Sequence, residues 1–139
     1  MAGEVDRGSA VRRYTTYEMF GIECGKGWVG LYQPLIDLCE MKGVEILQIK
    51  EKFGGLRFYC NSYKVTPTLQ LLVDAAENYS YRVCEECGKH GAIGWKDGQP
   101  VLEVTTGPSE TSSWVRSLCS PCRVAWDESR RAPNGGEER

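Results

Sequence analysis

The 139-residue sequence has no basic excess, no long apolar run and almost no histidine, and each shortage narrows the function. Its 17 Lys and Arg stand against 19 Asp and Glu, which gives a formal net charge of -2. Proteins that live on nucleic-acid phosphates usually carry a clear basic excess. No apolar run approaches the roughly 20 residues that cross a bilayer. The one histidine, His90, would have to serve any Ser-His or Cys-His catalytic group.

The first ten residues are polar and lack the apolar segment of a secretory signal, so we expect a cytoplasmic protein. Seven cysteines are present, and four of them form two C-x-x-C pairs. In a reducing compartment, this pattern indicates metal binding rather than disulfides.

The order of sequence patterns predicts an α+β fold: a helix, a β-hairpin, a second helix, then a four-cysteine zinc ribbon and a short C-terminal helix. We expect a flexible N-terminus over 1–12, a helix–hairpin–helix region over 13–82, the ribbon with its terminal helix over 83–131, and a disordered tail over 132–139.

The first helix is predicted over Gly27–Met41, ending at Gly43. Pro34 either starts its regular part or kinks it. Apolar residues recur at steps of three and four, which places them on one face: Trp28, Leu31, Leu35, Leu38 and Cys39.

The second helix is predicted over 66–82, with Thr66 as its cap and Pro67 at its first position. Its apolar stripe consists of Leu69, Leu72, Val73, Ala76 and Tyr79. Between the two helices, the β-prone runs 44–52 and 56–60 flank Phe53-Gly54-Gly55, which contains a Gly-Gly pair. This indicates a hairpin, because glycine supplies the positive φ of a tight turn.

Short strands are predicted over 92–95, 101–105 and 114–117, separated by glycine and proline, and we expect the ribbon to extend the hairpin sheet. A terminal helix follows over 123–131. Three tryptophans fall in this half and are interpreted as its core: Trp95, Trp114 and Trp126.

The two cysteine pairs, Cys84–Cys87 and Cys119–Cys122, are separated by 31 residues. Each pair can fold into a knuckle, and two knuckles supply the four thiolates that tetrahedral zinc needs. Four protein ligands leave no open position for water, so we predict one structural zinc ion and no catalytic metal. Nearby cations can offset the negative charge of the site: Arg82, Lys89 and Arg123.

Two alternatives to zinc stay open: four free buried thiols, and a redox dithiol at Cys119–Cys122, where a helix start would lower the thiol pKa. His90 can replace a ligand but is expected to be an exposed loop residue. Cys39 and Cys60 fall on apolar stripes and are expected in the core. Cys24 opens a Gly-x-Gly fragment that lacks the rest of a phosphate-binding loop, so we expect a plain loop there.

Basic and aromatic residues cluster around the hairpin tip: Lys50, Lys52, Phe53, Arg57 and Tyr59. They can contact phosphates and bases or acidic groups of a protein partner. Charges at this place can also simply solvate a strand edge and discourage aggregation.

The run Lys50-Glu-Lys-Phe-Gly-Gly-Leu-Arg-Phe-Tyr59, a preceding helix that ends in Leu38-Cys39, and the following Cys84-Glu-Glu-Cys87 resemble one family. This is a family of small, largely uncharacterised zinc-ribbon proteins of bacteriophages and prophages. The resemblance covers roughly residues 20–125. Family members often have a shorter stretch between the cysteine pairs than this chain, whose insert lies around 101–113.

The resemblance implies a phage-like source and expression in the bacterial host cytoplasm, and it brings no catalytic activity. Small accessory phage proteins often bind and inhibit a host factor. We therefore expect a non-enzymatic protein that binds a bacterial host protein, such as a component of an anti-phage defence system. The alternatives are a nucleic-acid-binding zinc ribbon and a thiol redox protein.

Overall fold

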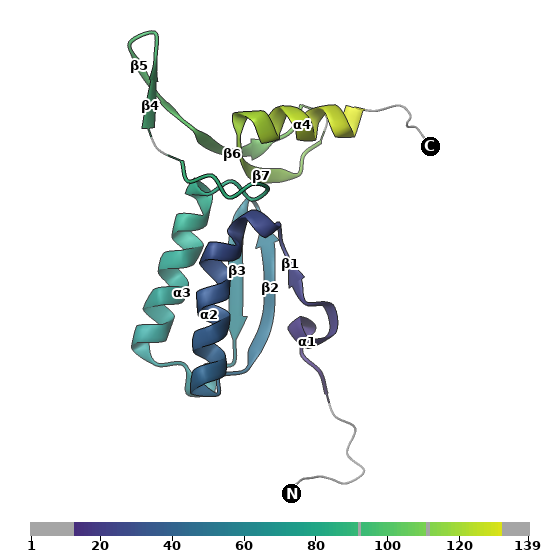
Figure 1. The fold of residues 1–139 in the computed structure, drawn as a ribbon. Coiled ribbons are helices and arrows are strands. Elements are labelled where there is room, and N and C mark those ends of the chain that lie inside the picture. The colour runs from purple at the N-terminus through teal and green to yellow at the C-terminus, as the bar shows by residue number, and fades with distance from the viewer. Residues whose placement is uncertain (1–12, 92, 111, 132–139) are drawn as a thin grey trace, which may run out of the picture.

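The computed structural model describes residues 13–91, 93–110 and 112–131 (Figure 1). Helices and strands are mixed along this part of the chain, which confirms the α+β class. Both predicted mobile ends, 1–12 and 132–139, lie outside the described residues. The elements in chain order are α1 (Thr16–Phe20), β1 (Ile22–Glu23), η1 (Lys26–Trp28), α2 (Val29–Lys42), β2 (Ile46–Lys52), β3 (Gly55–Cys60), η2 (Ser62–Lys64), α3 (Pro67–Tyr79), η3 (Ser80–Arg82), β4 (Ile93–Lys96), β5 (Gln99–Leu102), β6 (Val104–Pro108), β7 (Val115–Cys119) and α4 (Ser120–Arg131).

The first half of the chain is a three-stranded sheet with the order β1-β2-β3, packed against α2 and α3 (Figure 1). The predicted hairpin is the antiparallel pair β2–β3, and the short β1 adds to β2 in parallel. The core lies between the sheet and the two helices and is built from Trp28, Tyr32, Leu35, Ile36, Cys39, Val44, Ile46, Ile49, Leu56, Phe58, Leu69, Val73 and Val83.

Helix α2 ends as predicted at Gly43, whose φ of 68° is left-handed and whose N–H bonds to the carbonyls of Cys39 and Glu40. Pro34 lies inside the helix rather than at its start. The predicted start of α3 is confirmed, because the Thr66 side chain accepts a hydrogen bond from the Leu69 amide and Pro67 follows it.

The predicted apolar stripe of α3 is partly wrong. Leu69 and Val73 are buried, but Leu72 is 44% exposed and Tyr79 is 41% exposed. Ser80, just after α3, donates to the Glu77 carbonyl, and its hydroxyl accepts the Leu56 amide at 2.9 Å. The face of α3 that meets β3 is therefore narrow, and residues to one side of it stay at the surface.

The first hairpin strand ends at Lys52 as predicted, and the second begins at Gly55, one residue earlier than predicted. Lys52 pairs with Gly55, so the loop is Phe53–Gly54, and both loop residues have positive φ, 54° and 83°. This geometry belongs to the two-residue turns that match strand twist. Gly55 lies within β3, where an added Cβ would collide with the Tyr81 hydroxyl.

We call residues 83–131 the cysteine module. Its described strands form two separate two-stranded sheets, β4–β5 and β6–β7, so the expected extension of the hairpin sheet is wrong. The predicted strand over 101–105 is also wrong. The chain leaves β5 after Leu102 and enters β6 at Val104, in a different sheet.

The β4–β5 hairpin, residues 93–102, projects from the rest of the module (Figure 1), and we call it the arm. The interpretation of all three tryptophans as core is wrong. Trp126 is 8% exposed and packs with Leu118 and the cysteines, but Trp95 on the arm is 74% exposed and Trp114 is 45% exposed.

Candidate metal centre

The first cysteine pair lies on a tight knuckle that follows η3. The Cys84 amide donates to the Lys89 carbonyl at 2.8 Å, and the Gly88 amide donates back to the Cys84 carbonyl at 2.9 Å. Gly88 has a φ of 84°, a conformation that favours glycine. This turn brings the two sulfurs of the pair to one side.

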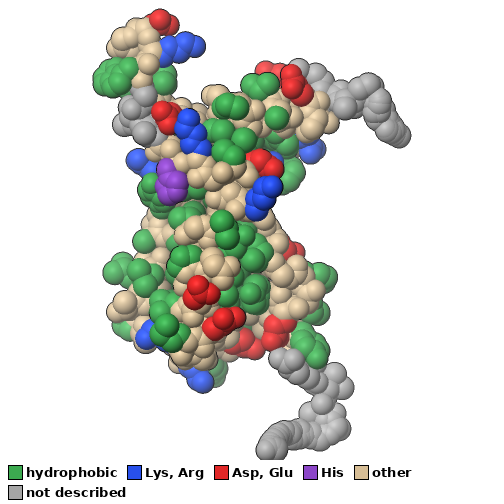
Figure 2. Space-filling model, in the orientation of Figure 1, with side chains coloured by type: hydrophobic (Ala, Val, Ile, Leu, Met, Phe, Trp, Pro, Cys, Tyr) green, Lys and Arg blue, Asp and Glu red, His purple; other side chains and the backbone are tan. Residues whose placement is uncertain are grey.

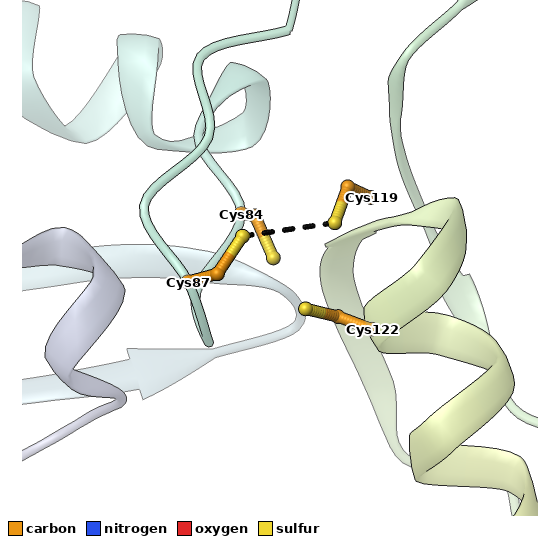
Figure 3. A group of neighbouring side chains, drawn as sticks. All are labelled: Cys84, Cys87, Cys119 and Cys122. Carbon is orange, nitrogen blue, oxygen red and sulfur yellow. Dashed lines mark hydrogen bonds between the residues drawn. The ribbon is translucent and has the colours of Figure 1, made fainter.

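The second cysteine pair lies where β7 passes into α4. Cys119 is the last residue of β7, and Cys122 lies in the first turn of α4, which starts at Ser120. In Figure 3 the four side chains point toward one another from these two segments. The four Sγ atoms all lie within 4.8 Å of one another, so the predicted cluster is confirmed.

The size of the cluster fits a tetrahedral thiolate site. Zn–S bonds of about 2.3 Å require sulfurs about 3.8 Å apart, and the Cys87 and Cys119 Sγ atoms are 3.7 Å apart. Cys84 and Cys119 are buried, Cys122 is half-buried and Cys87 is exposed. Sulfur, the only ligand type in the set, suits zinc among the common divalent ions.

The thiols of the cluster differ in how easily they lose a proton. Burial raises the pKa of Cys84, but hydrogen bonds from the backbone of Cys119, Cys87 and Glu86 outweigh it and lower that pKa to about 7. Burial, followed by hydrogen bonds among the cysteines, raises the pKa of Cys122. The Cys84 thiolate therefore forms readily, whereas the Cys122 thiolate requires a cation to stabilise it.

Glu85 and Arg116 form a buried ion pair beside the knuckle that the sequence did not predict. Glu85, which is 3% exposed, accepts a hydrogen bond from Arg116 Nε at 3.1 Å and another from the Gly25 amide at 2.9 Å. Arg116 also bonds Glu86 at 3.3 Å. In the sequence, Arg116 is an ordinary polar residue of a predicted strand. Its role appears only when the fold places β7 beside the knuckle that carries Glu85 and Glu86.

The Arg116 guanidinium also lies 5.3 Å from the ring centres of both Trp114 and Trp126. The two indoles meet edge to face with centroids 5.6 Å apart. Arg130 of α4 approaches the same rings at 5.7 and 5.9 Å. These contacts fix α4, and therefore Cys122, against β7.

Two of the cations predicted to offset the sulfurs have other partners. Lys89 pairs with Glu103 at 3.6 Å. Arg123 donates to the carbonyls of Thr105 and Arg116, at 2.6 and 2.9 Å. Arg123 therefore ties the start of α4 to the β6–β7 sheet.

The Gly25–Gly27 fragment is explained by close packing on the knuckle. The Gly27 amide donates to the Glu85 carbonyl, and Trp28 Nε1 donates to the Val83 carbonyl, both at 2.8 Å. An added Cβ at either glycine would collide with the backbone around Glu85. The fragment is thus a loop that docks the first half of the chain on the cysteine module.

The three remaining cysteines lie away from the cluster. Cys39 is buried, Cys60 packs against the core, and Cys24 is half-buried at the docking loop. Burial, with help from Glu85 and Glu51, raises the pKa of Cys24 to about 12. Burial and the neighbouring Cys60 raise the pKa of Cys39 to about 11. These thiols are poor nucleophiles at neutral pH.

Of the predicted hairpin contacts, three come together on the sheet face opposite the core. Lys50 pairs directly with Arg57, and its Nζ lies 5.9 Å from the Tyr59 ring centre. Arg57 donates to the Tyr81 hydroxyl at 3.1 Å, and Tyr59 is 40% exposed. The remaining two, Lys52 and Phe53, lie at the turn: Phe53 is 69% exposed, with Lys52 Nζ 5.7 Å from its ring.

The turn itself docks on the cysteine module. Ser117 Oγ donates to the Gly54 carbonyl at 2.6 Å, and Trp114 Nε1 donates to Glu51 at 3.0 Å. An added Cβ at Gly54 would meet Thr106 Cγ2 at 2.7 Å. One side of the hairpin tip is thus covered by the cysteine module, whereas the Phe53 side chain at the same turn is exposed.

His90 is exposed, as predicted, and its Nδ1 lies 3.1 Å from the Tyr79 hydroxyl. The four-sulfur cluster is formed without it. Within the described ranges, no helix has the length and apolar character needed to cross a membrane. Comparison of the chain with protein-family models, curated proteins and solved structures finds no match.

Proposed function

We propose that the cysteine cluster holds one structural zinc ion, with Cys84, Cys87, Cys119 and Cys122 as its ligands. The support is the all-sulfur ligand set and the 3.7 Å spacing between Cys87 and Cys119. Four protein ligands saturate tetrahedral zinc, so the ion would contribute folding energy rather than catalysis.

Metal analysis of the gently purified chain should return one zinc per chain, and a strong chelator should lower the melting temperature. Cys87→Ser should lose the metal, whereas Cys60→Ser, at a thiol outside the cluster, should keep it. Metal-free protein would overturn the assignment. Rapidly reacting Cys119 and Cys122 in zinc-loaded protein would instead favour the redox alternative.

We further propose that the chain is a non-enzymatic phage accessory protein that binds and inhibits a bacterial host protein of an anti-phage defence system. The single observation that carries protein binding is the arm. It projects from the module, and Trp95 and Leu102 on it are 74% and 58% exposed. The resemblance of the Lys50–Tyr59 run to phage proteins supports the source and the bacterial partner.

The arm has little structural use within the chain itself. None of the arm residues whose side chains the structure describes, 95–102, belongs to either hydrophobic core. The register pairs Trp95 with Pro100 and Ile93 with Leu102, so Trp95, Pro100 and Leu102 fall on one face of the hairpin. Tryptophan in such a position is the residue type most enriched at the energetic centres of protein interfaces.

The experiment is affinity capture from a bacterial lysate with the zinc-loaded chain as bait, followed by mass spectrometry. A specific protein should be retained by the wild type and lost by the double variant Trp95→Ala, Leu102→Ala. The control is Tyr63→Ala, because Tyr63 is 93% exposed but lies outside the arm. If the double variant and the Tyr63→Ala control captured the protein equally well, the arm would not be its binding site.

A nucleic-acid-binding ribbon is the second candidate, favoured by the pairing of Lys50 with Arg57 beside Tyr59. Basic and aromatic groups on one sheet face suit the backbone and bases of a single strand. Oligonucleotide binding that weakens steeply with salt and is lost in Lys50→Ala would support it. A lack of binding at low salt would eliminate it.

A further inference from the structure

The turn of the arm fixes which backbone groups of its two strands point outward. The turn residues Asp97 and Gly98 both have positive φ, 52° and 77°. Lys96 pairs with Gln99 across them. This is the geometry of a type I′ turn, in which the two flanking residues form a hydrogen-bonded pair. The ladder of the arm therefore starts from the turn with a hydrogen-bonded pair.

Hydrogen-bonded and non-hydrogen-bonded pairs alternate from the turn along the antiparallel ladder of the arm. Trp95 and Pro100, the next pair, are therefore not hydrogen-bonded to each other. Proline has no N–H to donate, which agrees with this position. Ile93 and Leu102 form the next pair of the same kind. The backbone N–H and C=O groups of these residues point away from the opposite strand, toward the outer edges of the hairpin.

The two outer edges of the arm offer different hydrogen-bonding groups. Pro100 removes a donor from the β5 edge, so a strand added there would lose a hydrogen bond. The β4 edge presents an N–H and a C=O from both Ile93 and Trp95. Within residues 13–91, 93–110 and 112–131, β4 pairs only with β5, and Figure 2 shows the arm standing clear of the rest of the visible face. An exposed edge of this kind is a template for a strand from another chain.

The side chains beside the β4 edge differ between its two faces. Trp95 is 74% exposed and lies on the same face as Leu102, which is 58% exposed. Lys96 is exposed on the opposite face. Among the described residues its ammonium group has no hydrogen-bond or ion-pair partner, and Asp97 lies in the turn, beyond the last pair. A strand added to β4 would therefore have an apolar neighbour on one face and a positive charge on the other.

We infer that the β4 edge of the arm binds an extended strand of the partner protein. This inference rests on the proposed protein-binding role of the arm and names the chemistry of the partner segment. The added strand would form backbone hydrogen bonds with the N–H and C=O groups of Ile93 and Trp95. It would place an apolar side chain beside Trp95 and an Asp or Glu beside Lys96. Apolar and acidic residues therefore alternate in the segment that the arm recognises.

The probe is a synthetic peptide of about seven residues that alternates Val and Glu, a length that spans a typical strand. The zinc-loaded full chain should bind it saturably, and the Trp95 amide should then exchange with solvent more slowly than in the free protein. The Leu102 amide, on the β5 edge, should exchange at an unchanged rate. A fully N-methylated Val/Glu peptide and a Val/Lys peptide are the controls, and both should bind at least about fivefold more weakly.

Lys96→Glu tests the acidic character of the segment. It should reverse the preference, so that the Val/Lys peptide binds more tightly than the Val/Glu peptide, because like charges directly opposite each other are destabilising. The control is Lys64→Glu, which makes the same change in net charge at an exposed residue outside the arm and should keep the wild-type preference.

Replacement of Trp95 with its α-hydroxy acid analogue separates the edge from the apolar face. It keeps the indole but turns the outward N–H into an ester oxygen, and it should weaken binding of the Val/Glu peptide about 3- to 10-fold. The matched control is the same replacement at Leu102, which removes an outward N–H from the β5 edge. Each ester also weakens one hydrogen bond of the pair Gly94–Val101, so the hairpin is perturbed equally and only the edge differs.

The inference fails if the Val/Glu peptide does not bind, if the two esters weaken binding equally, or if Lys96→Glu keeps the wild-type preference. Protection of the Trp95 amide that increases with protein concentration, without peptide, would place a second copy of the chain on β4 and would also overturn it. If the Trp95 ester captured the lysate protein as well as the wild type does, the edge would fail while the apolar face of the arm stood. If lysate capture failed but the peptide bound as expected, the proposed host partner would fail and the edge would stand.

Discussion

Glu85 and Arg116 form a buried ion pair beneath the cysteine cluster, with Oε1 3.1 Å from Nε and side chains only 4% and 10% exposed. The second carboxylate oxygen of Glu85 accepts the Gly25 amide. A single side chain thus joins the docking loop, the knuckle and β7. It acts together with the Trp28–Val83 and Ser117–Gly54 hydrogen bonds, which also hold the two halves of the chain against each other.

Glu85→Ala should lower the free energy of unfolding of the zinc-loaded protein by about 3 kcal/mol, because it leaves Arg116 buried without its main partner. Urea unfolding measures this loss. The matched control is Glu86→Ala, whose side chain is 54% exposed and should cost less than about 1 kcal/mol. Equal losses for the two variants would show that burial of the pair is unimportant.

Gly27→Ala should be destabilising by about 1–3 kcal/mol, since the new methyl group has no room against the Cys84 carbonyl. Gly107→Ala is the matched control, because an added Cβ there meets nothing within 4 Å. Thermal melting of both variants tests the close packing of the loop on the knuckle. A normal melting temperature for Gly27→Ala would contradict it.

Phe53→Asn should raise the free energy of unfolding by up to about 1 kcal/mol. Phe53 has a φ of 54°, which an aromatic residue tolerates poorly, whereas Asn-Gly is favoured at this type of turn. The ring is 69% exposed, so little packing is lost. If the variant is more stable yet binds a partner less well, Phe53 is retained for contact; a less stable variant would show a structural role for the ring.

Thiol titration of zinc-loaded protein at pH 8 should find no fast cysteine. Zinc would protect the four cluster thiols, and Cys24, with a pKa of about 12, would be only about 10⁻⁴ ionised. Because burial raises this pKa, the thiolate fraction and the reaction rate should increase about tenfold per pH unit above 8. Chelation should make four thiols reactive. A fast thiol that disappears in Cys24→Ala would refute the buried, protonated state of Cys24.

Local patterns predicted much of the fold. The Thr66–Pro67 helix start, the Gly43 helix end and the β2–β3 pairing depend on residues near in sequence, and the structure contains all three. The four-cysteine cluster could be predicted because ligand type and spacing are largely independent of the rest of the fold.

The features that were predicted wrongly or not at all depend on contacts between residues far apart in the sequence. Gly55 belongs to β3 rather than to the predicted loop, and an added Cβ there would collide with Tyr81, which lies far along the chain. Trp95 was assigned to the core from its size alone, and nothing local reveals that its hairpin projects from the module. The Glu85–Arg116 pair joins residues 31 positions apart, which no periodicity encodes.

The bond from Ser117 to the Gly54 carbonyl spans 63 positions of sequence. A ribosome adding about 5–20 residues per second needs several seconds to synthesise that interval. During translation, the turn of the β2–β3 hairpin therefore stays uncovered until β7 has been synthesised. The last two cysteines of the cluster are synthesised at nearly the same time. Nascent chains released before Ser117 would present an unprotected hairpin to chaperones and proteases, whereas the final segment covers the turn and completes the four-cysteine cluster in a single late step.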